Sequence, residues 1–353
     1  MNAQEPLLHL PAASPTEEIG VANWRGLSAM PKKRELYSKE TYFRESWRDA
    51  RQCLGALAVP QLQRTALLVL KPDAFFGRRA EAAIDFFRER RFVPIAWTEF
   101  RYTRCTMRED WRYQLNQLST DRLELNERLL TCADSTLVLF HDGDHEPALP
   151  AAVRMQALKG NSLPELHQPH QLRSVLHSTN RLFKFVHTAD EPADIVRELG
   201  VLFDSALRLE LYRMMGAGQS DGSEALQSHL HAKYAQFPEH ALGLQQSLAL
   251  LKQASAAGGP RARRLAVALE RYATDGLPPG RFLCLDAFEA ELDAAGLALP
   301  FLDTLVLATH FIHHSYPLEF AVMRGDGHDG WLSGEGRMAA PGEPCLLEQE
   351  SRP

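Results

Sequence analysis

The sequence lacks the hallmarks of several common classes of protein. Its five cysteines are odd in number, widely spaced and without a Cys-x-x-Cys pair, so they form neither a disulfide framework nor a zinc site and suit a reducing compartment. No apolar run approaches the roughly 20 residues that span a bilayer, and no basic region leads into an apolar core at the N-terminus. We therefore expect a cytoplasmic protein without a membrane anchor or a secretory signal.

Two further absences narrow the range of functions. No Gly-rich loop of the Walker type occurs, so any bound phosphate would be held by side chains, with or without a metal ion, and not by a nest of backbone amides. Positive charge is not in excess, since the net charge is -6. This argues against a protein that binds nucleic acid or anionic membranes in general. The 353 residues, 45% apolar and 24% charged, are ordinary for a globular protein of one large domain or two.

The composition divides the chain into four regions. An N-terminal extension begins with a loosely ordered arm and continues as a helix over 32–57. A mixed region then alternates strand and helix patterns, and a Gly- and Ser-rich linker separates it from a helical domain and a flexible tail rich in Gly, Pro and Glu. The predicted regions are 1–63, 64–215, 223–324 and 325–353.

The mixed region predicts an α+β fold. Short apolar runs predict four strands, at 65–70, 92–100, 135–140 and 182–186. Amphipathic patterns predict helices at 79–90, 107–118, 120–131, 148–158 and 191–207. This order predicts a ferredoxin-like arrangement, in which helices pack on a four-stranded, mainly antiparallel sheet.

Four basic residues of this region are candidates for a phosphate site. Lys71 ends the first strand, Arg154 lies on the helix before an irregular loop, and Arg173 lies in that loop, which runs from 159 to 180. Guanidinium groups match phosphate oxygens and a lysine adds a point charge. His187 follows the fourth predicted strand at once. The plainer interpretation is a solvated lysine and a structural histidine.

A histidine at this place can act as a nucleophile. A neutral imidazole attacks phosphorus and carries the phosphoryl group as phosphohistidine, provided that a partner on its other nitrogen fixes the tautomer. Glu198 is eleven residues further on, on the helix that starts just after His187. A helix that folds back beneath the strand would bring that carboxylate to the ring.

Residues 64–207 resemble nucleoside diphosphate kinases. Val-Leu-Lys-Pro-Asp-Ala (69–74) is similar to the first strand and the Lys-Pro-Asp signature of that family, and Leu-Lys-Gly-Asn-Ser-Leu-Pro (158–164) is similar to its Gly-x-Thr-x-Pro motif, with Ser162 in place of the threonine. The family's phosphate-binding arginines match Arg154 and Arg173, with slips of about one residue. Its phosphorylated histidine matches His187, and the glutamate that orients it matches Glu198.

The resemblance implies a role for each matched residue. Lys71 would contact the sugar hydroxyl and the phosphates, and Arg154, Ser162 and Arg173 would hold the terminal phosphates together with Mg²⁺. His187 would shuttle the γ-phosphoryl group by a ping-pong route. Tyr113 loosely matches a tyrosine of the family's helical hairpin. The resemblance also implies a homo-oligomer, although the extra regions could block the family's contacts; no metal site made by the protein alone is expected.

The sequence departs from the family where the nucleoside would be recognised. Lys184 replaces an asparagine that meets the sugar hydroxyl, Ala189 replaces a serine, and Leu123 and Leu125 stand near the place of an aromatic ring that stacks on the base. Lys184 would suit an extra anionic group on the ligand, or would extend to solvent.

Three functions remain in view. The leading hypothesis is a phosphotransferase that moves the γ-phosphoryl group of a nucleoside triphosphate such as ATP, through His187, to a nucleoside diphosphate or a related acceptor. The second is a catalytically weak nucleotide-binding module that contacts a partner protein. The third is another chemistry on nucleotides, with His187 as acid or base.

A second group of histidines lies in the predicted helical domain. His310 and His314 are spaced one helical turn apart, with His313 between them. This spacing can hold a metal ion, but neither a nearby cysteine nor a clear third ligand accompanies it. An interface or a packed helix is the favoured interpretation.

Overall fold

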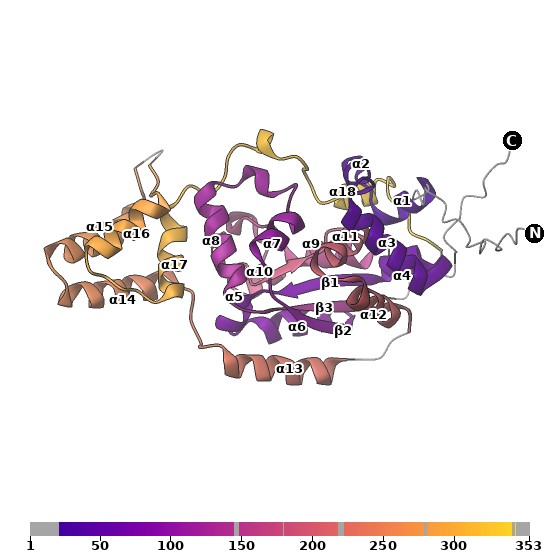
Figure 1. Ribbon diagram of the computed structural model, residues 1–353, viewed down its shortest axis with the longest axis horizontal. Coiled ribbons are helices and arrows are strands. Elements are labelled where there is room, and N and C mark those ends of the chain that lie inside the picture. The colour runs from indigo at the N-terminus through magenta and orange to yellow at the C-terminus, as the bar shows by residue number, and fades with distance from the viewer. Residues whose placement is uncertain are drawn as a thin grey trace, which may run out of the picture.

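The computed structural model of the protein describes residues 21–144, 148–178, 180–217, 222–278, 281–340 and 343. Figure 1 shows one sheet at the centre, helices on both of its faces and a separate group of helices at one end. The first 20 residues of the arm expected over 1–30 and the end of the predicted tail lie outside the described residues. Residues 21–30 are ordered, contrary to that expectation, because Trp24 and Leu27 are buried in the core. Within the part of the chain that is described, no helix is long and apolar enough to cross a membrane.

The sheet has four strands in the order β2-β3-β1-β4, and every pairing is antiparallel. This order is that of a ferredoxin-like sheet, so the predicted fold class is confirmed. The central strand β1 is buried along its whole length, which explains why its sequence is almost entirely apolar. The strands are β1 (Thr65–Leu70), β2 (Phe92–Phe100), β3 (Ser135–Asp142) and β4 (Val186–Thr188).

Side chains alternate between the two faces of the sheet and build two cores. Leu67 and Val69 face one core, which is closed mainly by α3 (Thr41–Leu54), α4 (Ala58–Arg64), α11 (Pro192–Leu202) and α12 (Ser205–Gly216). Leu68 and Leu70 face the other core. It is closed by α5 (Pro72–Phe76), α6 (Ala80–Arg88), α8 (Thr120–Thr131), α9 (Ala151–Lys159) and α13 (Ser223–Gln236).

The fourth strand is shorter and later than the sequence predicts. The expected strand at 182–186 is irregular, and β4 begins only at Val186. The reason is the backbone of Phe185, whose φ of +62° lies in the left-handed region and interrupts an extended chain. His187 therefore lies inside β4 and not after its end.

Three predicted helices are each split in two. The helix expected at 191–207 is α11 and α12, because the chain turns at Phe203 and the Asp204 side chain caps α12 by accepting from the backbone N–H of Leu207. The helix expected at 32–57 is α2 (Pro31–Tyr37) and α3, preceded by α1 (Val21–Leu27). The first hairpin helix is α7 (Arg104–Asp110), followed by the short turn η2 (Leu115–Gln117).

The C-terminal helices form a separate unit beside α8 (Figure 1). The unit consists of α14 (Leu244–Ala257), α15 (Pro260–Asp275), α16 (Leu285–Ala294) and α17 (Phe301–Phe311). Helix α13, which the boundary at 223 groups with them, instead packs on β2, α5 and α6. The structure thus places α13 with the sheet.

The chain after α17 returns across the hairpin to the N-terminal helices (Figure 1). It contains η4 (Leu318–Phe320) and α18 (His328–Leu332), where the buried Trp331 donates its indole N–H to Glu191 over 2.8 Å. The segment from 325 to 340, expected to be a flexible tail, is therefore packed against the sheet domain. Since α17 ends at Phe311, His310 and His314 do not share a helical face; the backbone carbonyls of His313 and His314 bond to Ser119.

Candidate functional site

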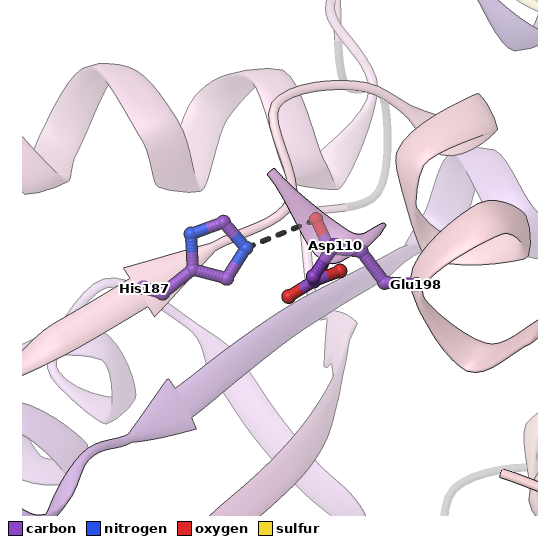
Figure 2. Close-up of side chains that lie close together, drawn as sticks. All are labelled: Asp110, His187 and Glu198. Carbon is purple, nitrogen blue, oxygen red and sulfur yellow. Dashed lines mark hydrogen bonds and ion pairs between the residues drawn. The ribbon is translucent and has the colours of Figure 1, made fainter. Parts of the chain in front are cut away.

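His187 lies on the face of β4 that α11 covers. It pairs in register with Val69 of β1, whose side chain points to the same core. The ring Nε2 lies 3.0 Å from Oε1 of Glu198 on α11 (Figure 2). The fold therefore brings the predicted histidine and glutamate together, because the helix runs back beneath the strand that precedes it.

Asp110 completes a cluster that the sequence did not predict. It is the last residue of α7, and its carboxylate lies with Glu198 and the His187 ring in a group whose ligand atoms are all within 4.8 Å of one another (Figure 2). The Tyr102 hydroxyl donates to Asp110 over 3.0 Å. The Asp110 side chain comes from the hairpin, 77 positions before His187 in the numbering, so no local motif reveals it.

Burial controls the protonation of this cluster. It lowers the pKa of His187 to about 4, against the opposing pull of the Asp110 carboxylate. Burial and the charge of Glu198 raise the pKa of Asp110 to about 7. Burial and the nearby Asp194 and Asp190 raise the pKa of Glu198 well above its usual value. At neutral pH the imidazole is neutral, and one ring nitrogen carries a lone pair.

A small cavity reaches this cluster from the side of the N-terminal helices. Its volume is about 130 Å³, too small for a nucleotide. Trp111 meets the His187 ring edge-on, with 5.2 Å between ring centroids. The cavity is lined by Tyr37, Asp110, Trp111, Gln114, His187, Asp190, Asp194, Arg197 and Glu198.

The Lys-Pro-Asp segment fixes the strained turn before His187. The buried Asp73 accepts the backbone N–H of Phe185 over 2.7 Å, and the backbone N–H of Lys71 bonds to the Phe185 carbonyl over 2.9 Å. The Lys71 ammonium also lies 3.4 Å from Asp73. Asp73 thus stabilises the left-handed backbone at Phe185 and holds Lys71 next to the chain that carries Lys184.

Lys71 and Lys184 belong to a larger cluster of cations. Lys159, at the end of α9, donates to the Thr188 hydroxyl over 2.7 Å, and Arg173 donates to the carbonyl of Gly160 over 2.8 Å. Burial holds the pKa of Lys184 well below its usual value, and four neighbouring cations act in the same direction: Arg122, Arg173, Lys71 and Lys159. Such a concentration of like charge is costly unless an anion binds to it.

We expect Lys159→Met to stabilise the protein near neutral pH. Burial and Arg173 lower the pKa of Lys159 to about 8, whereas an unfolded lysine titrates near 10.4. Between these values the unfolded chain binds more protons, so the charged ammonium destabilises the fold below pH 8 and this penalty fades as the pH rises towards 10.4. Urea unfolding should show a gain on the order of 2 kcal/mol at pH 7 that shrinks by more than half at pH 9.5.

An exposed lysine provides the control for this prediction. Lys252 pairs with Glu270 at the surface, so Lys252→Met should leave the stability nearly unchanged at both pH values. A loss of stability in Lys159→Met at pH 7, or a gain that does not depend on pH, would contradict the account of the cation cluster.

Arg154 lies away from the other candidates. Its guanidinium donates to Asp142 over 2.8 and 2.7 Å and to Asp144 over 3.2 Å. Asp142 is next to the start of β1, since its neighbour His141 pairs with Thr65, whereas Lys71 follows the end of that strand. Six strand residues separate the two ends by about 20 Å. The basic residue of α9 that lies beside β4 is Lys159, whereas Arg154 lies near the other end of β1. A role for Arg154 in phosphate binding stays a prediction.

Ser162 and Tyr113 lie in different surroundings. Ser162 is exposed on the long loop. The Tyr113 hydroxyl donates to Glu40 of the N-terminal segment over 2.6 Å, and its ring stacks with Tyr37. Tyr113 therefore contacts the N-terminal segment in the structure, and the role that the resemblance assigns to it at the nucleotide stays a prediction.

Buried ion pairs fasten the N-terminal helices to α11. Lys33 lies 2.5 Å from Asp194 and 3.0 Å from Glu191. Arg197 lies 2.6 Å from Glu40 and donates to the carbonyl of Asp110 over 2.7 Å. These contacts fix the helix that carries Glu198, so the N-terminal segment supports the position of the catalytic candidates.

Three solved structures illustrate what the chain is similar to. One is a nucleoside diphosphate kinase of Aquifex aeolicus, at 19% identity and a TM-score of 0.34, with 40% of this chain and 95% of that chain covered. Another is a nucleoside diphosphate kinase from Encephalitozoon cuniculi, at 14% identity and a TM-score of 0.34, with 39% of this chain and 87% of that chain covered. The third is a nucleoside diphosphate kinase family protein of Babesia bovis, at 13% identity and a TM-score of 0.34, with 40% of this chain and 90% of that chain covered.

All three structures are named as nucleoside diphosphate kinases or as a member of that family, which is the family that the sequence motifs resemble. No protein-family model matches the chain, and no curated protein matches it. The fold itself is ferredoxin-like. It brings a neutral histidine together with two carboxylates, and the charge of Lys159, one of the cations around Lys184, acts on that histidine.

Proposed function

We propose that the protein is a phosphotransferase that moves the γ-phosphoryl group of a nucleoside triphosphate, through a phosphohistidine at His187, to a nucleoside diphosphate or a related acceptor. The observation that carries this proposal is the pairing of His187 with Glu198. Nε2 of His187 and Oε1 of Glu198 share a proton. When that proton resides on Nε2, the lone pair of Nδ1 is free to attack phosphorus. The depressed pKa keeps the imidazole neutral at physiological pH.

The cation cluster supports the same proposal. Lys71, Arg173 and Lys184 lie close enough to affect one another's pKa, and they would neutralise the phosphate oxygens during in-line transfer. Lys184 adds a cationic side chain to Lys71 and Arg173, which the resemblance assigns to phosphate, and this favours an acceptor or donor with an additional anionic group.

Magnesium would enter with the nucleotide. One carboxylate among the cations, Asp73, is engaged by Lys71 and by the Phe185 backbone, so the phosphate oxygens themselves would supply most ligands of the ion. Bound Mg²⁺ would spread the negative charge of the transferred group. We propose a cytoplasmic enzyme that forms a homo-oligomer.

A second candidate function is a nucleotide-binding module without turnover. It is supported by the hydrogen bonds of Tyr113 with Glu40 and of Arg154 with Asp142, because these contacts engage two side chains that the resemblance assigns to the nucleotide.

A paired experiment separates the two candidates. Calorimetry with ATP and ADP measures binding, and a coupled assay measures the transfer from ATP to several nucleoside diphosphates. Binding with turnover is the expected result. Binding without turnover for any acceptor would favour the module, and absence of both would contradict a nucleotide site.

A further inference from the structure

We infer that Asp110, His187 and Glu198 form a binding site for a divalent first-row transition-metal ion, and that this ion switches off His187 as a nucleophile. The three residues offer one ring nitrogen and two carboxylates, with ligand atoms within 4.8 Å of one another. Ligands around a tetrahedral ion lie about 3.4 Å apart, so small side-chain rotations would close the site. Figure 2 shows the three side chains turned toward one another.

Two unpaired oxygens point independently to a ligand. One carboxylate oxygen of Asp110, Oδ1, and one of Glu198, Oε2, are buried and have no hydrogen-bond partner among the described residues. Both side chains are more than nine-tenths buried, at 4% and 6% exposure. Buried carboxylate oxygens without a donor are rare in native proteins, because the lost hydration is not replaced. A bound cation would satisfy both.

The charge around the adjoining cavity also favours a cation. Its lining contains four carboxylates, those of Asp110, Asp190, Asp194 and Glu198, against one guanidinium, that of Arg197. Asp194 is paired with Lys33, and Arg197 with Glu40. The cavity volume of about 130 Å³ leaves room for water ligands beside the ion.

The donor set selects the class of metal. Imidazole nitrogen suits Zn²⁺, Mn²⁺, Fe²⁺ and Co²⁺ and is a poor ligand for Mg²⁺ and Ca²⁺, which prefer oxygen alone. The transition-metal ion proposed for this site is therefore distinct from the Mg²⁺ that would accompany a nucleotide.

Metal binding and phosphorylation exclude each other at this histidine. The ion takes the Nε2 lone pair, so the single proton of the neutral imidazole, which Nε2 shares with Glu198 in the metal-free protein, moves through solvent to Nδ1. With its proton on Nδ1, the metal-bound ring has no free lone pair there to attack phosphorus. The site would thus link the activity of the protein to the supply of transition metal.

The test uses the full chain, stripped with a chelator and titrated with Co²⁺ in the absence of nucleotide. We expect one Co²⁺ per chain with a visible ligand-field band, and no thiolate charge-transfer band from cysteine. Asp110→Asn and Glu198→Gln should each weaken the affinity at least about tenfold. Asn at 110 retains an acceptor for Tyr102, and near-ultraviolet circular dichroism checks the fold of both variants.

Asp85→Asn is the matched control, because Asp85 is an exposed carboxylate that pairs with Arg88, and it should bind Co²⁺ as the wild type does. A missing band, or equal affinity in all variants, would overturn the metal site. Zn²⁺ at one equivalent should block phosphoenzyme formation; label formed with the ion bound would overturn the switch. Binding is read without nucleotide, so failure of the metal site and failure of the proposed phosphotransfer are distinguishable.

Discussion

His187→Ala should lower the rate of phosphoryl transfer from ATP to a nucleoside diphosphate by at least about 10⁴-fold. The substitution removes the atom that would form the covalent intermediate, and the remaining site can only hold the two nucleotides near each other. Steady-state assays over a range of acceptors measure the effect, with calorimetry to show that ATP still binds to the cation cluster.

His170→Ala provides the control for this result. His170 is exposed on the long loop, and its removal should leave the rate unchanged. A rate in His187→Ala within tenfold of the wild type would contradict the nucleophile assignment and any essential role of His187, whereas a loss of about 10²-fold would favour a role as acid or base. Urea unfolding of both variants excludes a loss of rate through unfolding.

Lys33→Met should lower the free energy of unfolding by about 3–5 kcal/mol. The Lys33 ammonium is almost completely buried between Asp194 and Glu191, and those carboxylates hold its pKa above the usual value despite the burial. Without the lysine, the carboxylates of Glu191 and Asp194 are left buried without a counter-charge and retain only neutral donors, such as the indole of Trp331. Urea denaturation at pH 7 measures the loss.

The neighbouring residue is an internal control for that prediction. Lys32 pairs with Glu35 at the surface over 2.9 Å, and Lys32→Met should leave the denaturation midpoint unchanged. Equal effects of the two substitutions would contradict the view that the N-terminal helices are held to α11 by buried charge. Because α11 also carries Glu198, Lys33→Met should reduce phosphoryl transfer as well.

The strands of the sheet could be predicted where the local pattern of apolar residues determines the structure. The first three strands are apolar runs bounded by breakers, and their predicted positions agree with β1, β2 and β3. The fourth was misplaced because a positive φ at Phe185 interrupts an otherwise strand-like sequence. That backbone is stabilised by Asp73 from a distant segment, a contact that no window of sequence around 185 contains.

The candidate site was predictable in part, for related reasons. His187 and Glu198 are eleven residues apart, joined by one turn, so their meeting follows from a strand and a helix that fold back on each other. Asp110 comes from the hairpin and gives no local signal. On α9, Arg154 and Lys159 are five residues apart, which turns them by about 140° around the helix axis. The two basic residues therefore point in different directions, and the sequence alone does not show that Lys159 is the one beside β4.

The C-terminal unit illustrates another limit of sequence pattern. Apolar periodicity predicts that α13 is a helix but not which surface it covers, and the structure packs it on the sheet. In the same way, the Gly- and Pro-rich composition after 325 predicts flexibility, whereas the indole of Trp331 is held by the buried Glu191. Long-range contacts decide both cases.

Incubation of the wild-type protein with ATP labelled at the γ-phosphate, followed by mapping of the label, tests the phosphotransfer proposal most directly. The predicted result is one label per chain that is labile in acid and stable in base, resides on His187, and passes to an added nucleoside diphosphate. Label that is stable in acid, or that persists in His187→Ala, would contradict the proposal.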